Sequence, residues 1–406
     1  MAVIVGLAVF LMSVMGTSVH HVASAMFTII VLLSFSAIKR WKYGFLSLSN
    51  VEKIFLLSFV FYAVSGALAY INTDDVDKYF RLFERYFRFF MAVPVFLFLV
   101  ERRLSALNYL YAGAVISGPF LLVIAMAHYY RNPDVPAQGY YHHIIFGQLA
   151  MLNVGIMLSL LLTRTMDRKI QLLIMASLLC GVVTAIMSQA RGVWLVLPIY
   201  VLIVVYYTIR GRRLSFPIIM TLFTVIVLIA LMTPIGGVIK QRTEAAVNEV
   251  SRFYTEDHYI SSVGTRLAMW DIAIDVWKQH PLFGTGPGDF DDEVMALQQK
   301  GEYLGMDVHN SVHNIYIQAL VGSGLVGLAA LLLAVVIAPL RLFLAAVATG
   351  NGAGLAGLVV IISYAVFGVS ESWILRLPAI SVFVIYVCVI AAHISLERRD
   401  QPDRSV

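Results

Sequence analysis

The chain alternates between long apolar runs and short polar breaks. A membrane-crossing helix needs about 20 predominantly apolar residues, and runs approaching or exceeding that length recur from end to end. They lie near residues 3–17, 19–38, 52–72, 87–100, 105–127, 142–163, 169–188, 191–208, 214–233, 312–340, 352–370 and 375–396. The pattern predicts an all-α fold, a polytopic membrane helical bundle of about twelve transmembrane helices.

One polar stretch, residues 235–311, is much longer than the other breaks. It divides the chain into a transmembrane bundle of about nine helices at 1–234, a loop domain at 235–311, and a second bundle of about three helices with a tail at 312–406. These boundaries follow from hydropathy alone.

The basic residues indicate which side each break faces. If the N-terminus is cytoplasmic, every even-numbered connection carries Lys or Arg, as the positive-inside rule requires. The outer breaks are acidic by comparison, and the 235–311 loop holds twelve Asp and Glu against six Lys and Arg. We therefore expect both termini in the cytoplasm and the large loop outside. The basic positions are Lys39, Arg40, Lys42, Arg102, Arg103, Arg164, Arg168, Lys169, Arg210, Arg212, Arg213, Arg341, Arg398 and Arg399.

Composition agrees with a membrane protein. Hydrophobic residues make up 60% of the chain and charged residues 13%, against about 45–50% and 25% in soluble domains. The net charge is +5, and the basic residues lie between the apolar runs and not on one soluble face. This distribution argues against nucleic acid as a partner. Cys180 and Cys388 lie inside apolar runs and are too few for a disulfide scaffold. Met1–Gly16 lacks a basic start and a cleavage site, so we expect a retained first span.

Five arginines depart from the cytoplasmic pattern and fall near the outer ends of spans. A single arginine there commonly extends its side chain to the lipid headgroups. Five on one face would form a cationic site suited to a diphosphate, which guanidinium groups bind by paired, charge-assisted hydrogen bonds. Arg191 is the strongest candidate, because it lies in a polar break at 188–192 between two apolar runs. The five are Arg85, Arg88, Arg191, Arg266 and Arg376.

The large loop contains two predicted helices. Leu267, Trp270, Ile274 and Trp277 recur at helical spacing and predict an amphipathic helix with an aromatic face, ended by His280-Pro281. A glycine-rich turn at 284–288 precedes a second, acidic helix at 289–300. The glycines do not follow a strand, so a nucleotide-binding loop is not indicated.

The chain re-enters the membrane through a segment that contains His309, His313 and Asn314. Such residues at the mouth of a span are costly to bury and usually mark function. Three interpretations remain open at this point. The histidines could bind a metal together with His142 and His143, they could be structural, or one could be a general base that removes a proton from a sugar hydroxyl.

The motifs of this region resemble a known family. Arg266 with Trp270, the segment His-Pro-Leu-Phe-Gly-Thr-Gly-Pro-Gly-Asp-Phe at 280–290, His313-Asn314, and Gly-Leu-Val-Gly at 324–327 are together similar to the shared signature of bacterial O-antigen ligases and polymerases. Within that superfamily the chain most resembles the ligases. One departure is Ser323, where many relatives carry an acidic residue before the glycine.

The resemblance implies a GT-C-like glycosyltransferase of the Gram-negative inner membrane with its site facing the periplasm. It implies an undecaprenyl-diphosphate-linked O-antigen donor, a lipid A–core oligosaccharide acceptor, inversion at the anomeric carbon and no cofactor or metal. By motif, His313 would be the general base, and Arg191 and Arg266 would hold the diphosphate. We add as candidate substrate contacts Arg88, Arg85, His309, Asn314 and Glu371, of which Glu371 would orient a catalytic group or pair with Arg376.

Three other functions compete with this interpretation. A polymerase or a protein O-oligosaccharyltransferase of the same superfamily shares the motifs. A transporter of lipid-linked sugar belongs to another class, and it would commonly show inverted repeats and broken helices near the bilayer midplane. No repeat between the two halves is evident, and the polar residues gather at the outer edge.

Overall fold

The computed structural model describes residues 1–16, 18–210, 241, 244–245, 247–251, 261–309 and 311–400. Across these ranges the secondary structure is helical and contains no strand, in agreement with the predicted all-α class. Before the large loop lie α1 (Ala2–Met15), α2 (Val22–Ser34), α3 (Trp41–Leu46), α4 (Asn50–Leu68), α5 (Val76–Phe90), α6 (Ala92–Glu101), α7 (Leu107–Arg131), α8 (His143–Thr163), α9 (Arg168–Met187), α10 (Arg191–Trp194) and α11 (Leu197–Ile209). The loop and the C-terminal part contain α14 (Ser262–Gln279), α15 (Phe290–Gln299), α16 (Ile315–Leu331), α17 (Ala338–Ala348), α18 (Ala353–Phe367) and α19 (Leu377–Asp400).

Seven helical segments of the described residues are long and apolar enough to cross a membrane, so the chain is a membrane helical protein. The expectation of about twelve spans stays a prediction, and the expected span at 214–233 lies outside the described residues. Shorter apolar helices lie at Ala2–Met15, Arg191–Tyr207 and Ala353–Phe367. The seven segments are Val22–Leu46, Asn50–Asn72, Leu107–Arg131, His143–Thr163, Arg168–Met187, Ile315–Ala348 and Leu377–Asp400.

Helices α8 and α19 lie inside the bundle. The most apolar stretch of α8 is 94% buried and that of α19 is 89% buried, against 28% for the segment that contains α2. A polar contact joins several helices in this interior: the Asn153 amide of α8 donates to the Ser13 carbonyl and the Ser117 hydroxyl, both at 2.8 Å. Hydrogen bonds of this kind hold helices together where no water is available.

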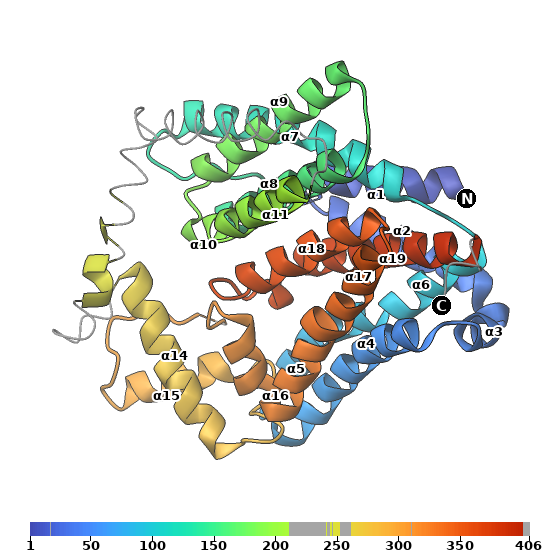
Figure 1. The fold of residues 1–406 in the computed structure, drawn as a ribbon. Coiled ribbons are helices and arrows are strands. Elements are labelled where there is room, and N and C mark those ends of the chain that lie inside the picture. Colours follow the sequence, from blue (N-terminus) through green and yellow to red (C-terminus); the bar gives the residue numbers. More distant parts are fainter. Residues whose placement is uncertain are drawn as a thin grey trace.

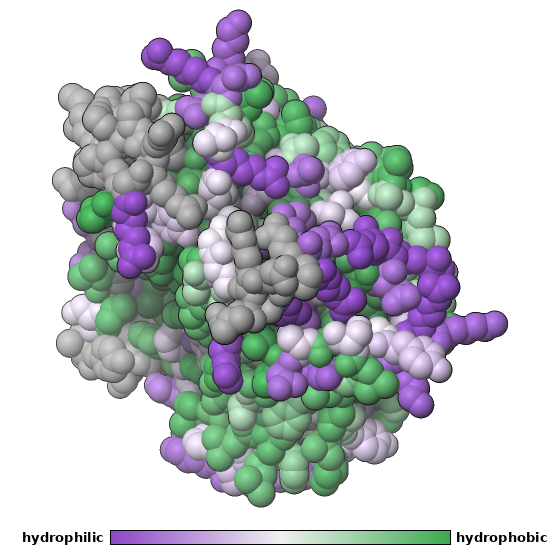
Figure 2. Space-filling view, turned by 45° about the vertical axis from the view of Figure 1, so that its right-hand side comes forward, coloured by the Kyte–Doolittle hydropathy of each residue, from purple (hydrophilic) through white to green (hydrophobic). Residues whose placement is uncertain are grey.

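The two chain termini lie at one end of the bundle, and α14 and α15 lie at the opposite end (Figure 1). In a space-filling view, hydrophobic residues cover broad areas of the surface and hydrophilic residues gather largely in a band between them (Figure 2). Broad apolar areas on the surface are typical of a protein that contacts lipid.

Helix α5 corrects the expected position of the fourth span. Residues 72–78 were expected to form an outer connection and 87–100 a single span, but α5 begins at Val76, where Asp75 accepts a hydrogen bond from the Lys78 N–H at 2.8 Å. A break at Met91 separates α5 from the buried α6. The charged and aromatic residues of α5 fall on different sides, so this helix is amphipathic and not a uniform apolar span.

Helix α16 is interrupted at Gly324, whose φ of 66° and ψ of −163° are not helical. Two N–H groups just after the break form hydrogen bonds outside the helix. Leu325 donates to the Pro281 carbonyl at 2.9 Å, and Val326 donates to the Leu282 carbonyl at 3.2 Å. A Cβ on Gly324 would lie 2.2 Å from the Leu282 carbonyl carbon. The glycines of the signature therefore let the 281–285 loop dock its backbone into α16.

The two predicted loop helices are both present, but the buried face of the first is shifted. Helix α14 buries Met269, Ile272 and Val276, whereas Trp270 and Trp277 are only half-buried. The tryptophans lie at the edge of this face because their indole N–H groups donate to backbone carbonyls, those of Val312 at 2.8 Å and Pro281 at 3.0 Å. With residues of α15 and α16, the buried side chains form a second hydrophobic core: Ala268, Met269, Ile272, Ala273, Val276, Phe290, Val294, Met306, Val312 and Val321.

Candidate active site

His313 stands immediately before α16, on a backbone that is fixed on both sides. The Val312 carbonyl accepts a hydrogen bond from the Trp270 indole at 2.8 Å, and the Val312 N–H donates to the Gln318 side chain at 3.0 Å. His313 itself has a left-handed φ of 52°, which is uncommon for a residue other than glycine. Strained backbone of this kind is found at functional sites, where the surrounding structure enforces it.

Asn314 caps α16. Its side-chain oxygen accepts hydrogen bonds from the N–H groups of Tyr316 at 2.9 Å and Ile317 at 3.2 Å. The side-chain NH₂ donates to the Val369 carbonyl at 3.2 Å, and the backbone N–H donates to the Ser372 hydroxyl at 3.1 Å. The polar atoms of Asn314 thus hold the start of α16 against the loop that follows α18, and this places its neighbour His313 beside that loop.

Glu371, in the α18–α19 loop, contacts His313 directly. Its Oε2 lies 2.9 Å from His313 Nδ1, and its Oε1 lies 3.5 Å from Arg376 Nε. Burial acts to raise the pKa of Glu371, but the hydrogen bond with His313 and the positive charges of His313, Arg376 and Arg266 outweigh it and lower the pKa. Glu371 is therefore a carboxylate, and it can accept only the proton on His313 Nδ1 in a hydrogen bond. The second ring nitrogen, Nε2, takes no part in this contact.

A first cavity of about 290 Å³, which we call the α10-side cavity, lies where the α10 segment meets the start of α8. The α10 segment approaches the α18–α19 loop closely, since a Cβ on Gly192 would lie 1.7 Å from the Ser370 hydroxyl. The start of α8 is held to the same place by His143 Nδ1, 2.7 Å from the Ser188 carbonyl. The lining residues are Pro136, His142, His143, Ile144, Gln189, Ala190, Arg191, Gly192, Arg266, His313 and Ser370.

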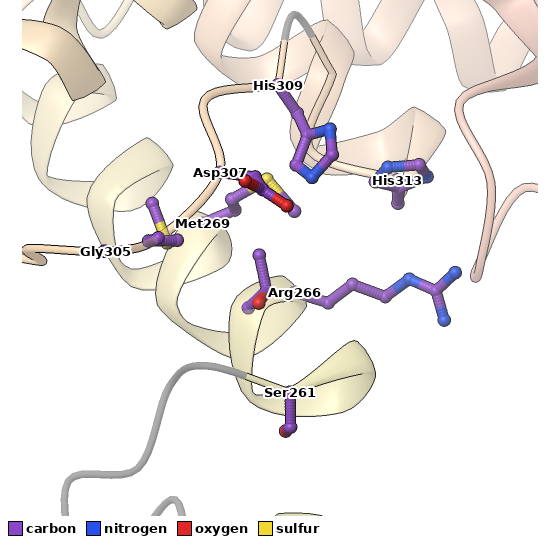
Figure 3. A pocket seen from close by; sticks show the side chains of 9 residues that line it. Ser261, Arg266, Met269, Gly305, Asp307, His309 and His313 are labelled. Carbon is purple, nitrogen blue, oxygen red and sulfur yellow. The ribbon is translucent and has the colours of Figure 1, made fainter.

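A second cavity of about 320 Å³, the loop-side cavity, also borders His313 (Figure 3). The Arg266 side chain extends from α14 toward His313, while Asp307 and His309 face the same space from the segment after α15. His313 and Arg266 line both cavities. The lining residues are Ser261, Thr265, Arg266, Met269, Gly305, Met306, Asp307, His309 and His313.

Three of the five predicted arginines gather around this junction. Burial lowers the pKa of Arg266, the negative charge of Glu371 opposes the shift and the positive charge of Arg191 adds to it, which shows that all three groups lie close together. Arg376 contacts Glu371 on the far side. An anion that entered here would meet several guanidinium groups, of which Arg266 is partly shielded from water.

Arg85 and Arg88 lie apart from the two cavities and line neither. Arg88 is engaged elsewhere: it donates to the Ser381 hydroxyl at 2.6 Å and to Glu84 Oε1 at 2.9 Å, and it lies 5.2 Å from the centre of the Phe27 ring. Arg85 donates to the Leu375 carbonyl at 3.3 Å, close to Arg376. The structure therefore gives Arg88 helix-joining contacts instead of the phosphate contact expected from its position in the sequence.

His142 and His143 were considered only as metal ligands, yet they line the α10-side cavity beside Arg191. Burial lowers the pKa of His142, and the charges of Arg376, His313 and Arg266 add to the effect, so a neutral imidazole faces this space. The described ranges contain no group of three His, Cys, Asp or Glu placed to hold a metal ion. The sequence feature that could have indicated this position is a pair of adjacent histidines at the start of a predicted span.

Comparison with known proteins adds independent information. The sequence model of a family described as O-antigen ligase matches residues 175–332. This match supports membership of the O-antigen ligase superfamily. The matched residues include Arg191, Arg266 and His313, and they end before Glu371. A Haemophilus influenzae protein described as uncharacterized is 28% identical over 316 residues, which are 75% of this chain and 76% of that protein.

The family match indicates a general class of activity. Members are glycosyltransferase-like membrane enzymes, ligases and polymerases, and their substrates are generally a lipid-linked glycan and a lipid acceptor. The arginines and the histidine with a carboxylate partner meet at the end of the bundle that carries α14 and α15 (Figure 1). The site thus places a histidine with a carboxylate partner next to a pocket lined by arginines.

Proposed function

We propose that this protein is an O-antigen ligase that transfers an O-antigen glycan from undecaprenyl diphosphate to lipid A–core oligosaccharide. The reaction takes place at the periplasmic face of the Gram-negative inner membrane. The loop of residues 235–311 faces the periplasm between the two transmembrane bundles, and both termini lie in the cytoplasm. The observation that carries the proposal is the position of His313 and Arg266, which border both a cavity with Arg191 and a second, separate cavity.

The reaction forms one glycosidic bond and breaks one bond to phosphate. The acceptor hydroxyl attacks the anomeric carbon, and its proton passes to Nε2 of His313. The bond between that carbon and the diphosphate oxygen breaks, and undecaprenyl diphosphate leaves with the electron pair. Attack from the face opposite the leaving group inverts the anomeric configuration.

Arg191 and Arg266 stabilise the charge that develops on the leaving diphosphate. A glycosyl diphosphate is already a good leaving group, so fixed guanidinium groups in a site with little water suffice in the role that a metal ion has elsewhere. Glu371 holds the His313 ring in the required tautomer and stabilises the imidazolium formed during the transfer. Binding two lipid-anchored substrates at one junction supplies further acceleration by orienting them.

The identity of the product tests this function. The purified protein in nanodiscs would receive undecaprenyl-diphosphate glycan and rough lipopolysaccharide in the presence of EDTA, and the products would be separated on a gel. Lipopolysaccharide that carries the added glycan is the expected result. Lengthening of the glycan on its own lipid carrier, with the core acceptor ignored, would instead identify a polymerase.

A further inference from the structure

The two cavities that meet at His313 differ in charge. Among the described residues, the α10-side cavity contains Arg191 and the shared Arg266, and no carboxylate lines it. Among the same residues, the loop-side cavity contains the carboxylate of Asp307, and its arginine is the shared Arg266. The first cavity is therefore cationic and the second has both charges, so the two suit different substrates.

The charge of each cavity favours one substrate. A diphosphate is strongly anionic, so it is attracted to Arg191 and repelled by Asp307. A sugar carries no charge and presents several hydroxyl groups, each of which can donate a hydrogen bond to a carboxylate. Ser261 and Thr265 add hydroxyl groups to the same wall, and Met269 and Met306 add an apolar surface for the ring carbons.

We propose that the loop-side cavity is the subsite for the acceptor sugar and that Asp307 binds one of its hydroxyl groups. The proposal rests on the proposed glycosyl transfer and assigns a position and a recognition residue to its second substrate. The acceptor and the diphosphate then occupy separate cavities that both border His313. An inverting displacement needs the two substrates to be separated, because the attacking hydroxyl must face away from the leaving group.

His309 is the second polar group of this subsite. Its ring centre lies 5.6 Å from that of His313. Burial lowers the pKa of His309, the charge of His313 adds to the shift and the charge of Asp307 opposes it, so the ring is neutral and can both donate and accept a hydrogen bond. A volume of about 320 Å³ is at the lower end for ligand pockets and suits a terminal sugar rather than a long glycan.

Binding of the two substrates can be measured separately with the full-length protein in nanodiscs. The probes are undecaprenyl diphosphate for the α10-side cavity and delipidated core oligosaccharide for the loop-side cavity. The test variants are Asp307→Asn and Arg191→Gln. Glu302→Gln is the matched control, since it removes an equal charge from the same segment at a residue that lines neither cavity.

Asp307→Asn is expected to weaken binding of the core oligosaccharide by about 10- to 100-fold, as for loss of a hydrogen bond to a charged group. Its affinity for undecaprenyl diphosphate should stay at the wild-type value. Arg191→Gln should show the reverse pattern, and Glu302→Gln should change neither affinity. Equal losses for both probes in Asp307→Asn, or no loss for either, would overturn the subsite assignment.

Failure of the proposed function has a different signature. If the wild type binds undecaprenyl diphosphate but no core oligosaccharide, the ligase proposal fails. The same variants are then compared for binding of delipidated repeat-unit glycan, the acceptor of a polymerase. A loss in Asp307→Asn would support the subsite with that acceptor, and equal binding by wild type and variant would overturn it.

Discussion

His313 Nδ1 and Glu371 Oε2 lie 2.9 Å apart although 58 residues separate them in the chain. Glu371 is only 2% exposed, and its other oxygen lies near Arg376. A buried carboxylate in this position accepts the Nδ1 proton, fixes the orientation of the ring and leaves Nε2 free to take a proton from a hydroxyl. In the proposed reaction, this contact turns a histidine on a strained backbone into an oriented base.

Glu371→Gln should lower kcat strongly with little change in the KM for the donor. The side-chain amide can donate a hydrogen bond to Nδ1, and this stabilises the tautomer whose Nε2 already carries a proton. The expected loss of kcat is about 10²- to 10⁴-fold, by comparison with the equivalent change in a serine protease triad. The dependence of kcat on pH should also change. His393–Glu397, another histidine–carboxylate pair at 3.1 Å, supplies the control Glu397→Gln. A wild-type kcat and pH profile in Glu371→Gln would contradict this role.

The pH dependence of stability should also depend on Glu371. Its pKa is lower in the folded protein than the ordinary value of 4.5, so its ionised form stabilises the fold above that pH. The contribution is lost as the pH falls through the folded-state pKa. Between pH 6 and pH 3 the Tm of the wild type should therefore fall more than that of Glu371→Gln. Parallel Tm curves for the two proteins would argue against a stabilising carboxylate here.

Gly324→Ala should destabilise the protein severely. A positive φ at alanine costs about 1–3 kcal/mol, and the new Cβ would lie 2.2 Å from the Leu282 carbonyl carbon, which adds an overpacking cost of about 1–3 kcal/mol. Gly350→Ala is the matched control, because Gly350 has a φ of 80° with nothing within 4 Å. Thermal unfolding in detergent should show a much larger loss of Tm for Gly324→Ala. Equal losses would mean that backbone docking at Gly324 is unimportant.

Arg88→Gln should reduce stability without changing the affinity for undecaprenyl diphosphate. Hydrogen bonds to charged groups contribute about 1.5–3 kcal/mol, and Glu84 is half exposed, which weakens its pairing with Arg88. We expect a loss of about 1–2 kcal/mol, seen as a lower Tm. Arg191→Gln, measured beside it, should weaken donor binding instead. Weaker binding of undecaprenyl diphosphate by Arg88→Gln would contradict this prediction and indicate that Arg88 contacts the donor.

Local patterns in the sequence predicted those parts of the protein that depend on neighbouring residues. Apolar runs gave the helices of the bundle, and helical spacing followed by His280-Pro281 gave the end of α14 correctly. The break at Met91 and the amphipathic α5 were not predicted, because Arg85 and Arg88 were interpreted as separate residues near a span end and Arg81 on the same helix face was not included. The shifted face of α14 was missed because large aromatic residues were given more weight than the small residues that pack more closely.

Long-range contacts could be predicted only in part. The motif resemblance selected Arg191, Arg266 and His313, which the fold brings to one junction. The direct contact of Glu371 with His313 was only one of two alternatives, since no spacing rule links residues 58 apart. Asn314 was expected to bind substrate, but its position one residue before α16 makes it a helix cap. Ser323, the departure from the family pattern, lies 2.8 Å from the Tyr86 hydroxyl and joins α16 to α5.

The most direct test of the central claim is the rate of a single transfer by His313→Ala in nanodiscs, with EDTA present and binding of undecaprenyl diphosphate measured alongside. We predict that transfer falls by about 10²- to 10⁴-fold, the contribution typical of a general base, while binding of undecaprenyl diphosphate stays at the wild-type level. A His313→Ala protein that transfers glycan at the wild-type rate would contradict the assignment of His313 as the base.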